Sequence, residues 1–252
     1  MRKRKKLDGS DINNALVGGA CLIAVITLGL CTAPTDAKAQ DVAKGARPEI
    51  AFNAAIGSDY VFRGVSQNEG DPAISAGVDV TQGVFYAGAW AGTVSFAGDA
   101  DTDAEIDLYA GVRPAFGGFD WDFGVVGYVY AGQPDGADYD YVELKAAASR
   151  AVGRATLGAA IYYSPDFFGA SEDEATYAEI NAAISPADKW TLSAALGRQW
   201  VSSDFDYTTW NLGAAYQLTE RLGLDVRYFD TDEHGFGSAY DSRVVASLKA
   251  NF

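Results

Sequence analysis

The side chains best suited to chemistry in this sequence are charged groups in two short stretches. The first stretch, SDYVFRG, runs from Ser58 to Gly64 and carries Asp59 and Arg63 on either side of two aromatic residues. The second surrounds the single histidine, His234, and supplies carboxylates at Asp230, Asp232 and Glu233. A carboxylate or a serine held against a histidine could activate water or act as a nucleophile. Neighbours within one loop do not define that geometry, so we do not expect an enzyme, and a hydrolase is the third alternative.

Closely spaced acids could support another kind of chemistry, the binding of a hard cation. Asp99, Asp101, Asp103 and Glu105 alternate along the chain, and Ca²⁺ prefers several carboxylate oxygens. The spacing is not that of an EF-hand loop, with its glycine and closing glutamate. We therefore expect solvated loops, with bridging of loop carboxylates to lipopolysaccharide phosphates by divalent ions as the alternative. Phosphate-loop, dinucleotide and zinc motifs do not occur, so no dedicated metal site and no cofactor is predicted.

The N-terminal stretch has the layout of a secretory signal. Basic residues in MRKRKK precede an apolar run from Ala15 to Leu30 and the small-residue site Ala37-Lys38-Ala39. The apolar run is shorter than the ~20 residues that a spanning helix needs, which disfavours the alternative of a membrane anchor. We therefore predict a signal peptide over residues 1–39, a short periplasmic lead-in over 40–47 and one domain over 48–252.

Charge and cysteine usage restrict the function further. The chain has 34 acidic and 19 basic residues and a formal net charge of −15. This sign argues against nucleic acid as a partner and favours cations near the surface. Both cysteines, Cys21 and Cys31, fall in the predicted signal peptide. The exported part would therefore have no disulfide, no thiol nucleophile and no thiolate metal site.

The charged groups must be positioned by β-strands, because apolar residues recur at every second position rather than at helical spacing. In one segment the alternation pairs Leu222, Leu224, Val226 and Tyr228 with Gly223, Asp225, Arg227 and Phe229. A soluble β-sandwich also alternates, but its outward face is the polar one. The lengths of the connections separate the two architectures.

Twelve strands are predicted, over residues 48–62, 73–81, 84–96, 104–114, 119–131, 141–151, 154–164, 175–185, 189–201, 208–218, 221–231 and 241–252. Tight turns such as Gln82-Gly83 and Val152-Gly153 alternate with longer, acidic connections. This alternation is typical of an outer-membrane barrel, with short periplasmic turns and longer loops outside. We therefore predict an all-β fold, a transmembrane antiparallel up-and-down β-barrel of twelve strands in the bacterial outer membrane.

Aromatic residues are expected at both edges of the apolar band of such a barrel. Trp190 and Trp200 share a face, and their spacing corresponds to about 33 Å along a strand and about 25 Å along the barrel axis. The predicted girdle residues are Tyr60, Phe62, Trp121, Trp190, Trp200 and Trp210, with Tyr128 and Tyr216 as further members. Arg198 shares this face, so it lies at the outer rim or a bulge near Gly197 turns it inward.

The opposite face of each strand would line the lumen. There Asp59 and Arg63 lie ~13 Å apart along the first strand, so each is expected to pair with another strand, in an ion-pair network or along a solute path. The inward acids are Asp59, Asp79, Glu105, Asp107, Asp120, Asp122, Glu143, Glu179 and Asp225, and the inward bases are Arg63, Arg113, Lys145, Arg227, Arg243 and Lys249. The acidic excess predicts a weak preference for cations if the barrel conducts.

The SDYVFRG stretch, with Ser66-Gln67 and Pro72-Ala73 after it, resembles the N-terminal signature of the TorF family of proposed porins. Later stretches are similar in kind, among them Tyr162 to Gly169 and Val244 to Phe252. The resemblance implies an outer-membrane barrel and a porin function, and it supplies no catalytic residues. Separately, a last strand that ends in Phe252 resembles the signal by which outer-membrane proteins reach the barrel-assembly machinery.

Two functions fit these observations. The first is a channel for passive passage of small polar solutes or ions, in contact with outer-membrane lipid and lipopolysaccharide. Twelve strands lie between the small side-chain-filled barrels and the wide porins, so its bore should be narrow or partly blocked. The second is a closed structural or binding barrel with acidic extracellular loops. Inward charges that pair and fill the lumen would indicate closure, and charges segregated across a gap would indicate conduction.

Overall fold

The computed structural model describes residues 47–169, 174–201 and 205–252. The predicted signal peptide, with its cleavage site at Ala37-Lys38-Ala39, and most of the predicted lead-in lie outside these ranges. No helix within them is long and apolar enough to cross a membrane.

Within the described ranges the chain forms twelve long strands. They are β1 (Glu49–Gly57), β4 (Ala73–Gln82), β5 (Phe85–Thr93), β6 (Ala104–Val112), β8 (Phe119–Ala131), β9 (Tyr141–Val152), β10 (Ala155–Ser164), β11 (Ala175–Ala187), β12 (Trp190–Trp200), β13 (Tyr207–Gln217), β14 (Leu222–Thr231) and β15 (Arg243–Asn251). The short elements are β2 (Val61–Phe62), β3 (Val65–Ser66), β7 (Ala115–Phe116) and the 3₁₀ turns η2 (His234–Phe236) and η3 (Ser238–Tyr240).

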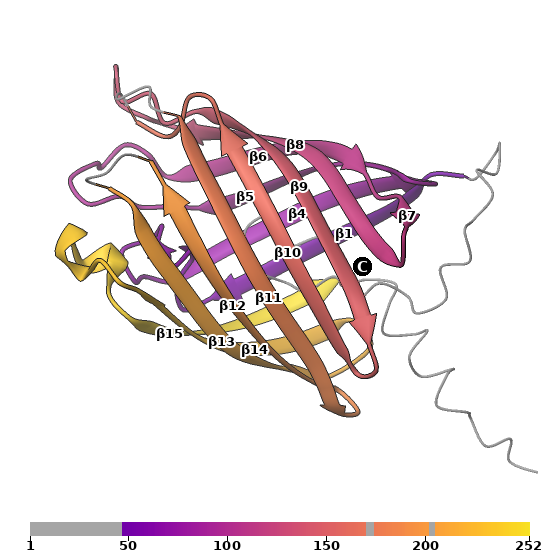
Figure 1. The fold of residues 1–252 in the computed structure, drawn as a ribbon. Coiled ribbons are helices and arrows are strands. Elements are labelled where there is room, and N and C mark those ends of the chain that lie inside the picture. The colour runs from indigo at the N-terminus through magenta and orange to yellow at the C-terminus, as the bar shows by residue number, and fades with distance from the viewer. Residues whose placement is uncertain (1–46, 170–173, 202–204) are drawn as a thin grey trace, which may run out of the picture.

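The long strands close into one barrel. Each pairs antiparallel with the next long strand along the chain, and the ring closes where β1 pairs with β15. Figure 1 shows the tilted strands wound into a closed barrel. The predicted all-β, twelve-stranded, up-and-down barrel is therefore confirmed.

The two ends of the barrel differ in the lengths of their connections. At the short-turn end, tight turns contain positive-φ residues such as Gly83, Gly153 and Lys189, in agreement with the predicted turns. At the other end, the long-connection end, lie β2, β3, η2 and η3 (Figure 1). The first strand is where the prediction is wrong, because β1 ends at Gly57 and not at Phe62.

The alternation along each strand places apolar residues outside and polar residues inside. Leu212 and Ile180 are among the most exposed large apolar residues, at 63% and 62%, whereas their neighbours Asn211 and Glu179 are buried. A surface of this kind is stable only against lipid, because exposing so many apolar side chains to water would cost a large free energy. The soluble sandwich is therefore the wrong alternative.

The lipid-facing position of Leu212 predicts the effect of a charge there. Leu212 lies in the middle of β13, so Leu212→Arg should lower the free energy of unfolding in phospholipid vesicles by roughly 2–4 kcal/mol. The matched control is Leu218→Arg, which lies just past the end of the same strand and should cost only about 0–1 kcal/mol. Equal costs at the two positions would contradict a lipid-facing outer surface.

Candidate functional site

The chain leaves the barrel wall after β1 and folds into the lumen as a hairpin. Residues 59–67, here called the inner hairpin, contain β2 and β3, which pair through Val61 with Ser66 and Phe62 with Val65. The two residues between them, Arg63 and Gly64, have φ values of 49° and 85°. Two consecutive positive φ values are the requirement of a type I′ turn, the favoured two-residue hairpin connection.

Two glycines allow this path. A Cβ on Gly57 would lie 2.9 Å from the carbonyl oxygen of Asp59, so a larger residue would obstruct the bend out of β1. A Cβ on Gly64 would lie 2.1 Å from Oγ1 of Thr209 on β13, because the turn packs directly against that strand. The inner hairpin is thus fitted to the wall at its start and at its tip.

The predicted girdle positions of Tyr60 and Phe62 are therefore wrong. Tyr60 is only 7% exposed, and its hydroxyl donates a hydrogen bond of 3.1 Å to Oε1 of Glu105. Phe62 packs against the ring of Tyr128 with centroids 6.0 Å apart. Both side chains lie inside the barrel because the backbone has left the sheet, so the alternation of β1 no longer sets their direction.

Arg63 joins the inner hairpin to the far wall. Its guanidinium donates to both carboxylate oxygens of Glu143 on β9, at 2.8 and 2.7 Å, and to Oε1 of Gln199 at 3.0 Å. In the strand order β9 lies five strands from β1 in one direction and seven in the other. The inner hairpin, which starts at the end of β1, therefore reaches almost across the lumen to this pair.

Aromatic rings enclose the guanidinium of Arg63. Its Cζ lies 4.4 Å from the ring centroid of Tyr177 and 4.9 Å from that of Tyr162. Cations are attracted to the faces of aromatic rings, most strongly where water is excluded, and Arg63 is only 5% exposed. The inner hairpin is thus held by an ion pair, hydrogen bonds and ring contacts at one residue.

Asp59 is held on the opposite side of the inner hairpin. It accepts hydrogen bonds of 2.9 Å from Nη1 of Arg243 on β15 and from Oγ of Ser66. Asp59 and Arg63 therefore pair with other strands and not with each other, as expected from their spacing. All four ion-pair partners, Asp59, Arg63, Glu143 and Arg243, lie inside the barrel, and their role in solute passage stays a prediction.

A second group of ion pairs lies nearer the short-turn end. Asp122 accepts from Lys145 at 2.8 Å and from Arg113 at 3.2 Å, and also from the hydroxyl of Tyr86 at 2.7 Å. On the other side of the lumen, Arg227 pairs with Asp225 at 3.3 Å. Lys249 lines the same part of the lumen but forms no ion pair with any described carboxylate.

Several inward carboxylates have no basic partner among the described residues. Asp79 accepts from Tyr109 and Asn53, Glu105 from Tyr60, and Glu179 from Tyr177 and Asn181. Both carboxylate oxygens of Asp107 form no hydrogen bond with any residue that the structure describes, although this side chain is fully buried. Asp120, the remaining inward acid, is half-buried at the short-turn end. The carboxylates without a described basic partner are thus spread around the lumen wall, on β4, β6, β8 and β11.

The tryptophans predicted for the girdles lie on the outside of the barrel. Trp190, Trp200 and Trp210 are 36–44% exposed, and Trp121 stacks between Phe116 and Phe123 near the short-turn end. Tyr216 contacts Trp190, but Tyr128 is 1% exposed and faces inward, so its predicted girdle position is wrong. Their function as membrane anchors stays a prediction.

Two further predicted residues, Arg198 and Phe252, can be placed. Arg198 lies at the rim, where it donates to Thr208 and faces Asp206 and Asp232, and the strand register runs unbroken past Gly197. The inward bulge is therefore the wrong alternative. Phe252 exchanges two backbone hydrogen bonds with Phe52, and its side chain is 65% exposed.

Inward-facing aromatic residues are what the sequence analysis missed. Trp90, Tyr86, Tyr109, Tyr141 and Tyr177 are all buried inside the barrel. A usable signal was present, because Tyr109, Tyr141 and Tyr177 each stand two residues from an inward acid and therefore share its face. The lumen is consequently more aromatic and more filled than the charges alone indicated.

The acidic run after β5 does not gather into a cation site. Asp99 accepts hydrogen bonds from Thr102 and Asp101, which hold the pKa of its carboxyl below the usual range, while Glu105 points into the lumen. Across residues 47–169, 174–201 and 205–252, no group of three or more histidine, cysteine or acidic side chains is placed to hold a metal ion.

The single histidine forms one defined contact. Nε2 of His234 lies 2.8 Å from Oδ1 of Asp230, whose other oxygen accepts from the hydroxyl of Tyr228 at 2.6 Å. The hydrogen bond to Asp230 raises the pKa of His234 above its ordinary value. The histidine side chain is half exposed at the long-connection end, outside the lumen described above.

The sequence matches one family model, described as "Bacterial protein of unknown function (Gcw_chp)", over residues 42–252. The chain belongs to this family. No curated protein matches the chain. Because the matched family has no assigned function, the resemblance to the TorF family stays a prediction.

Solved structures with a similar fold are outer-membrane porins. The KdgM porin aligns with a TM-score of 0.55 at 8% identity, covering 81% of this chain and 98% of its own. The NanC porin aligns with a TM-score of 0.52 at 11% identity and the same two coverages. At these identities the likeness shows the fold alone. A closed antiparallel barrel with an apolar outer face is the outer-membrane architecture, so this member of the Gcw_chp family lies in the bacterial outer membrane.

The buried ion pair at the tip of the inner hairpin predicts a large effect of single substitutions. Arg63→Met leaves Glu143 as an unpaired buried charge, so the free energy of unfolding should fall by roughly 3–5 kcal/mol. Adding Glu143→Leu should recover most of that loss, which denaturant titration of the refolded variants would measure. The control is Arg198→Met. The ion pairs of Arg198 are 3.6–3.8 Å long and partly exposed, so their loss should lower the free energy of unfolding by only about 0–1 kcal/mol. Similar small losses for Arg63→Met would contradict a docked hairpin.

The contact of His234 predicts a pH dependence. Since its folded-state pKa is raised above 6.5, the contact stabilises the protein fully below about pH 6.5, and this contribution is lost as pH rises through the raised pKa. Asp230→Asn should return the pKa of the imidazole toward its ordinary value, because the largest cause of the shift is removed. As the chain has one histidine, an NMR titration of the imidazole protons needs no assignment. An unchanged pKa in the variant would rule out the contact.

Proposed function

We propose that the protein is a narrow outer-membrane channel for passive passage of small polar solutes or ions, with a weak preference for cations. The observation that carries this proposal is the imbalance of charge inside the barrel. Four buried carboxylates, Asp79, Glu105, Asp107 and Glu179, have no basic side chain within ion-pair distance among the described residues. Of the six inward bases, five form ion pairs, and Lys249 forms none with a carboxylate in the described ranges.

The physical argument concerns which ions such a lumen would accept. Ion pairs neutralise their members, so they contribute little net field to the lumen, whereas unpaired carboxylates attract cations. Charged side chains lining a pore set its selectivity in this way. Asp107 is the strongest case, because a fully buried carboxylate without any hydrogen-bond donor gains most from a positive charge or a proton nearby.

The inner hairpin supports a narrow bore. It spans the lumen near the long-connection end, between Arg243 on β15 and Glu143 on β9. Solutes would have to pass beside it, which excludes bulky ones. One KdgM porin structure is described as a complex with oligogalacturonate, a polyanion. The unpaired carboxylates of this chain disfavour a polyanion, so we propose a solute of different charge.

The second candidate is a closed barrel whose acidic loops serve binding or envelope integrity. This candidate is favoured by the same inner hairpin, because the ion pairs formed by Arg63 and Asp59 fill the lumen near the long-connection end. The two candidates differ in whether ions cross the protein, and in whether the inner hairpin is the element that stops them.

Conductance of the refolded protein in a planar bilayer, under a salt gradient, tests both candidates. We expect discrete steps and a reversal potential that indicates cation preference. Glu105→Gln with Asp107→Asn should reduce the cation-to-anion permeability ratio on the order of twofold, because two lumen charges are removed. The matched control is Asp188→Asn with Glu220→Gln, which removes two carboxylates from turns outside the lumen and should change nothing.

A further variant separates a closed barrel from a narrow channel. Residues 60–66 are replaced by a short Gly-Ser link, which removes the inner hairpin and leaves the strands in place. Conductance only in this variant would support the closed barrel and overturn the channel. Anion preference in the unmodified protein would overturn the cation selectivity while leaving a channel.

A further inference from the structure

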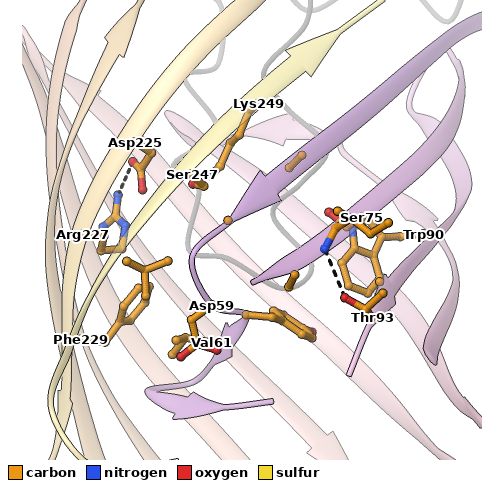
Figure 2. Close-up of a pocket in the computed structure, with 17 residues that line it drawn as sticks. Asp59, Val61, Ser75, Trp90, Thr93, Asp225, Arg227, Phe229, Ser247 and Lys249 are labelled. Atoms are coloured by element: carbon orange, nitrogen blue, oxygen red, sulfur yellow. Dashed lines mark hydrogen bonds and ion pairs between the residues drawn. The ribbon is translucent and has the colours of Figure 1, made fainter. Parts of the chain in front are cut away.

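A cavity of about 70 Å³ lies inside the barrel directly beneath the inner hairpin. Figure 2 shows Asp225 and Arg227 on one side of it and Trp90 and Thr93 on the other. The space exists because five of the inward residues that line it from three adjacent strands, β1, β4 and β5, are small. These residues are Ala55, Gly57, Ala73, Ser75 and Gly92.

The charged group of the cavity that could bind an anion is the ammonium of Lys249. It lines the cavity from β15, together with Ser247 (Figure 2). The nearby carboxylate of Asp225 already pairs with Arg227, which also donates to Asn211 and Ser193. The ammonium group of Lys249 has no ion-pair partner in the described part of the chain, so an anion entering the cavity would not have to displace one.

Apolar side chains form the rest of the cavity. Val61 of the inner hairpin packs with Phe229 and Val245, and these three side chains cover the side of the cavity that faces the long-connection end. The ring of Trp90 lies over Gly92, where a Cβ would come within 2.3 Å of the indole, and 5.5 Å from the ring of Tyr60. A ligand here would therefore place an apolar body against these groups and a charged head toward Lys249.

We infer that this cavity binds a small carboxylate with a short apolar body, the carboxylate on Nζ of Lys249 and the body between Trp90 and Val245. The site rests on the proposed function, since it lies in the lumen of the proposed channel, but binding does not require conduction. A lysine in partly buried, largely apolar surroundings gains from an anionic partner, because an unpaired charge is costly there. The cavity volume limits the body to a few carbon atoms.

Butyrate is the probe, and its amide, butyramide, is the neutral control of the same shape. Saturation-transfer NMR on the detergent-refolded protein should show butyrate binding with a dissociation constant on the order of 1 mM, as expected for so small a ligand. Butyramide and butylamine should show no saturable binding. Butyrate should also change the tryptophan fluorescence, and Trp90→Phe should remove that change, because the other four tryptophans, Trp121, Trp190, Trp200 and Trp210, lie on the outside.

Variants of the lysine decide the role of its charge. Lys249→Met should weaken butyrate binding at least tenfold and Lys249→Arg should retain it, while Lys189→Met, in the tight turn between β11 and β12, should have no effect. Equal binding of butyrate and butyramide, or unchanged binding in a folded Lys249→Met protein, would overturn the site. A protein that binds butyrate and never conducts would overturn the channel and leave the site standing. Conduction without saturable butyrate binding would overturn the site and leave the channel standing.

Discussion

The ion pair between Arg63 and Glu143 is the contact on which the interior of this barrel depends. Two charges removed from water cost several kcal/mol each, so such a pair persists only where the geometry is good and the remaining donors are satisfied. Here the fork of the guanidinium meets both oxygens of Glu143, Gln199 takes a further hydrogen bond, and aromatic rings cover the faces. The inner hairpin starts at the wall next to β1, and the pair fixes its tip to β9 on the nearly opposite wall, so the pair determines where the hairpin lies.

The lipid environment explains why the interior is built from polar contacts. The outward face must be apolar, and the alternation of a strand then assigns the remaining residues to the inside. An ordinary apolar core cannot form there, so the lumen is held by ion pairs and by tyrosine hydroxyls that donate to carboxylates. Tyr109 on Asp79 and Tyr177 on Glu179 are examples. Tyrosine suits this position because its ring packs against the wall while its hydroxyl satisfies a buried acid.

Much of this architecture could be predicted from the sequence, because alternation and turn length are local properties. The twelve strands, the five tight turns and the inward position of residues such as Asp122, Lys145 and Arg227 follow from them. The path of the chain after Gly57 does not, since Asp59, Tyr60 and Arg63 continue the alternation of β1 after the backbone has left the sheet. The local signal was limited to Gly64, because a type I′ hairpin favours glycine at its second turn position, whereas Arg63 is not a residue that favours the first. The pairing with Glu143, eighty residues away, depends on closure of the whole barrel.

The inner hairpin also determines which side chains line the part of the lumen nearer the short-turn end. Because the chain leaves the wall at Gly57, no side chains of β1 continue toward the long-connection end, and Val61 and Tyr60 of the inner hairpin cover the cavity instead. The same bend that fills the lumen near the long-connection end therefore encloses the cavity under it. Charges that hold the hairpin, such as Asp59 and Arg63, are neutralised in doing so. The groups left for a solute are those that no structural contact uses, Asp107 on β6 and Lys249 on β15, and they lie on different strands of the wall.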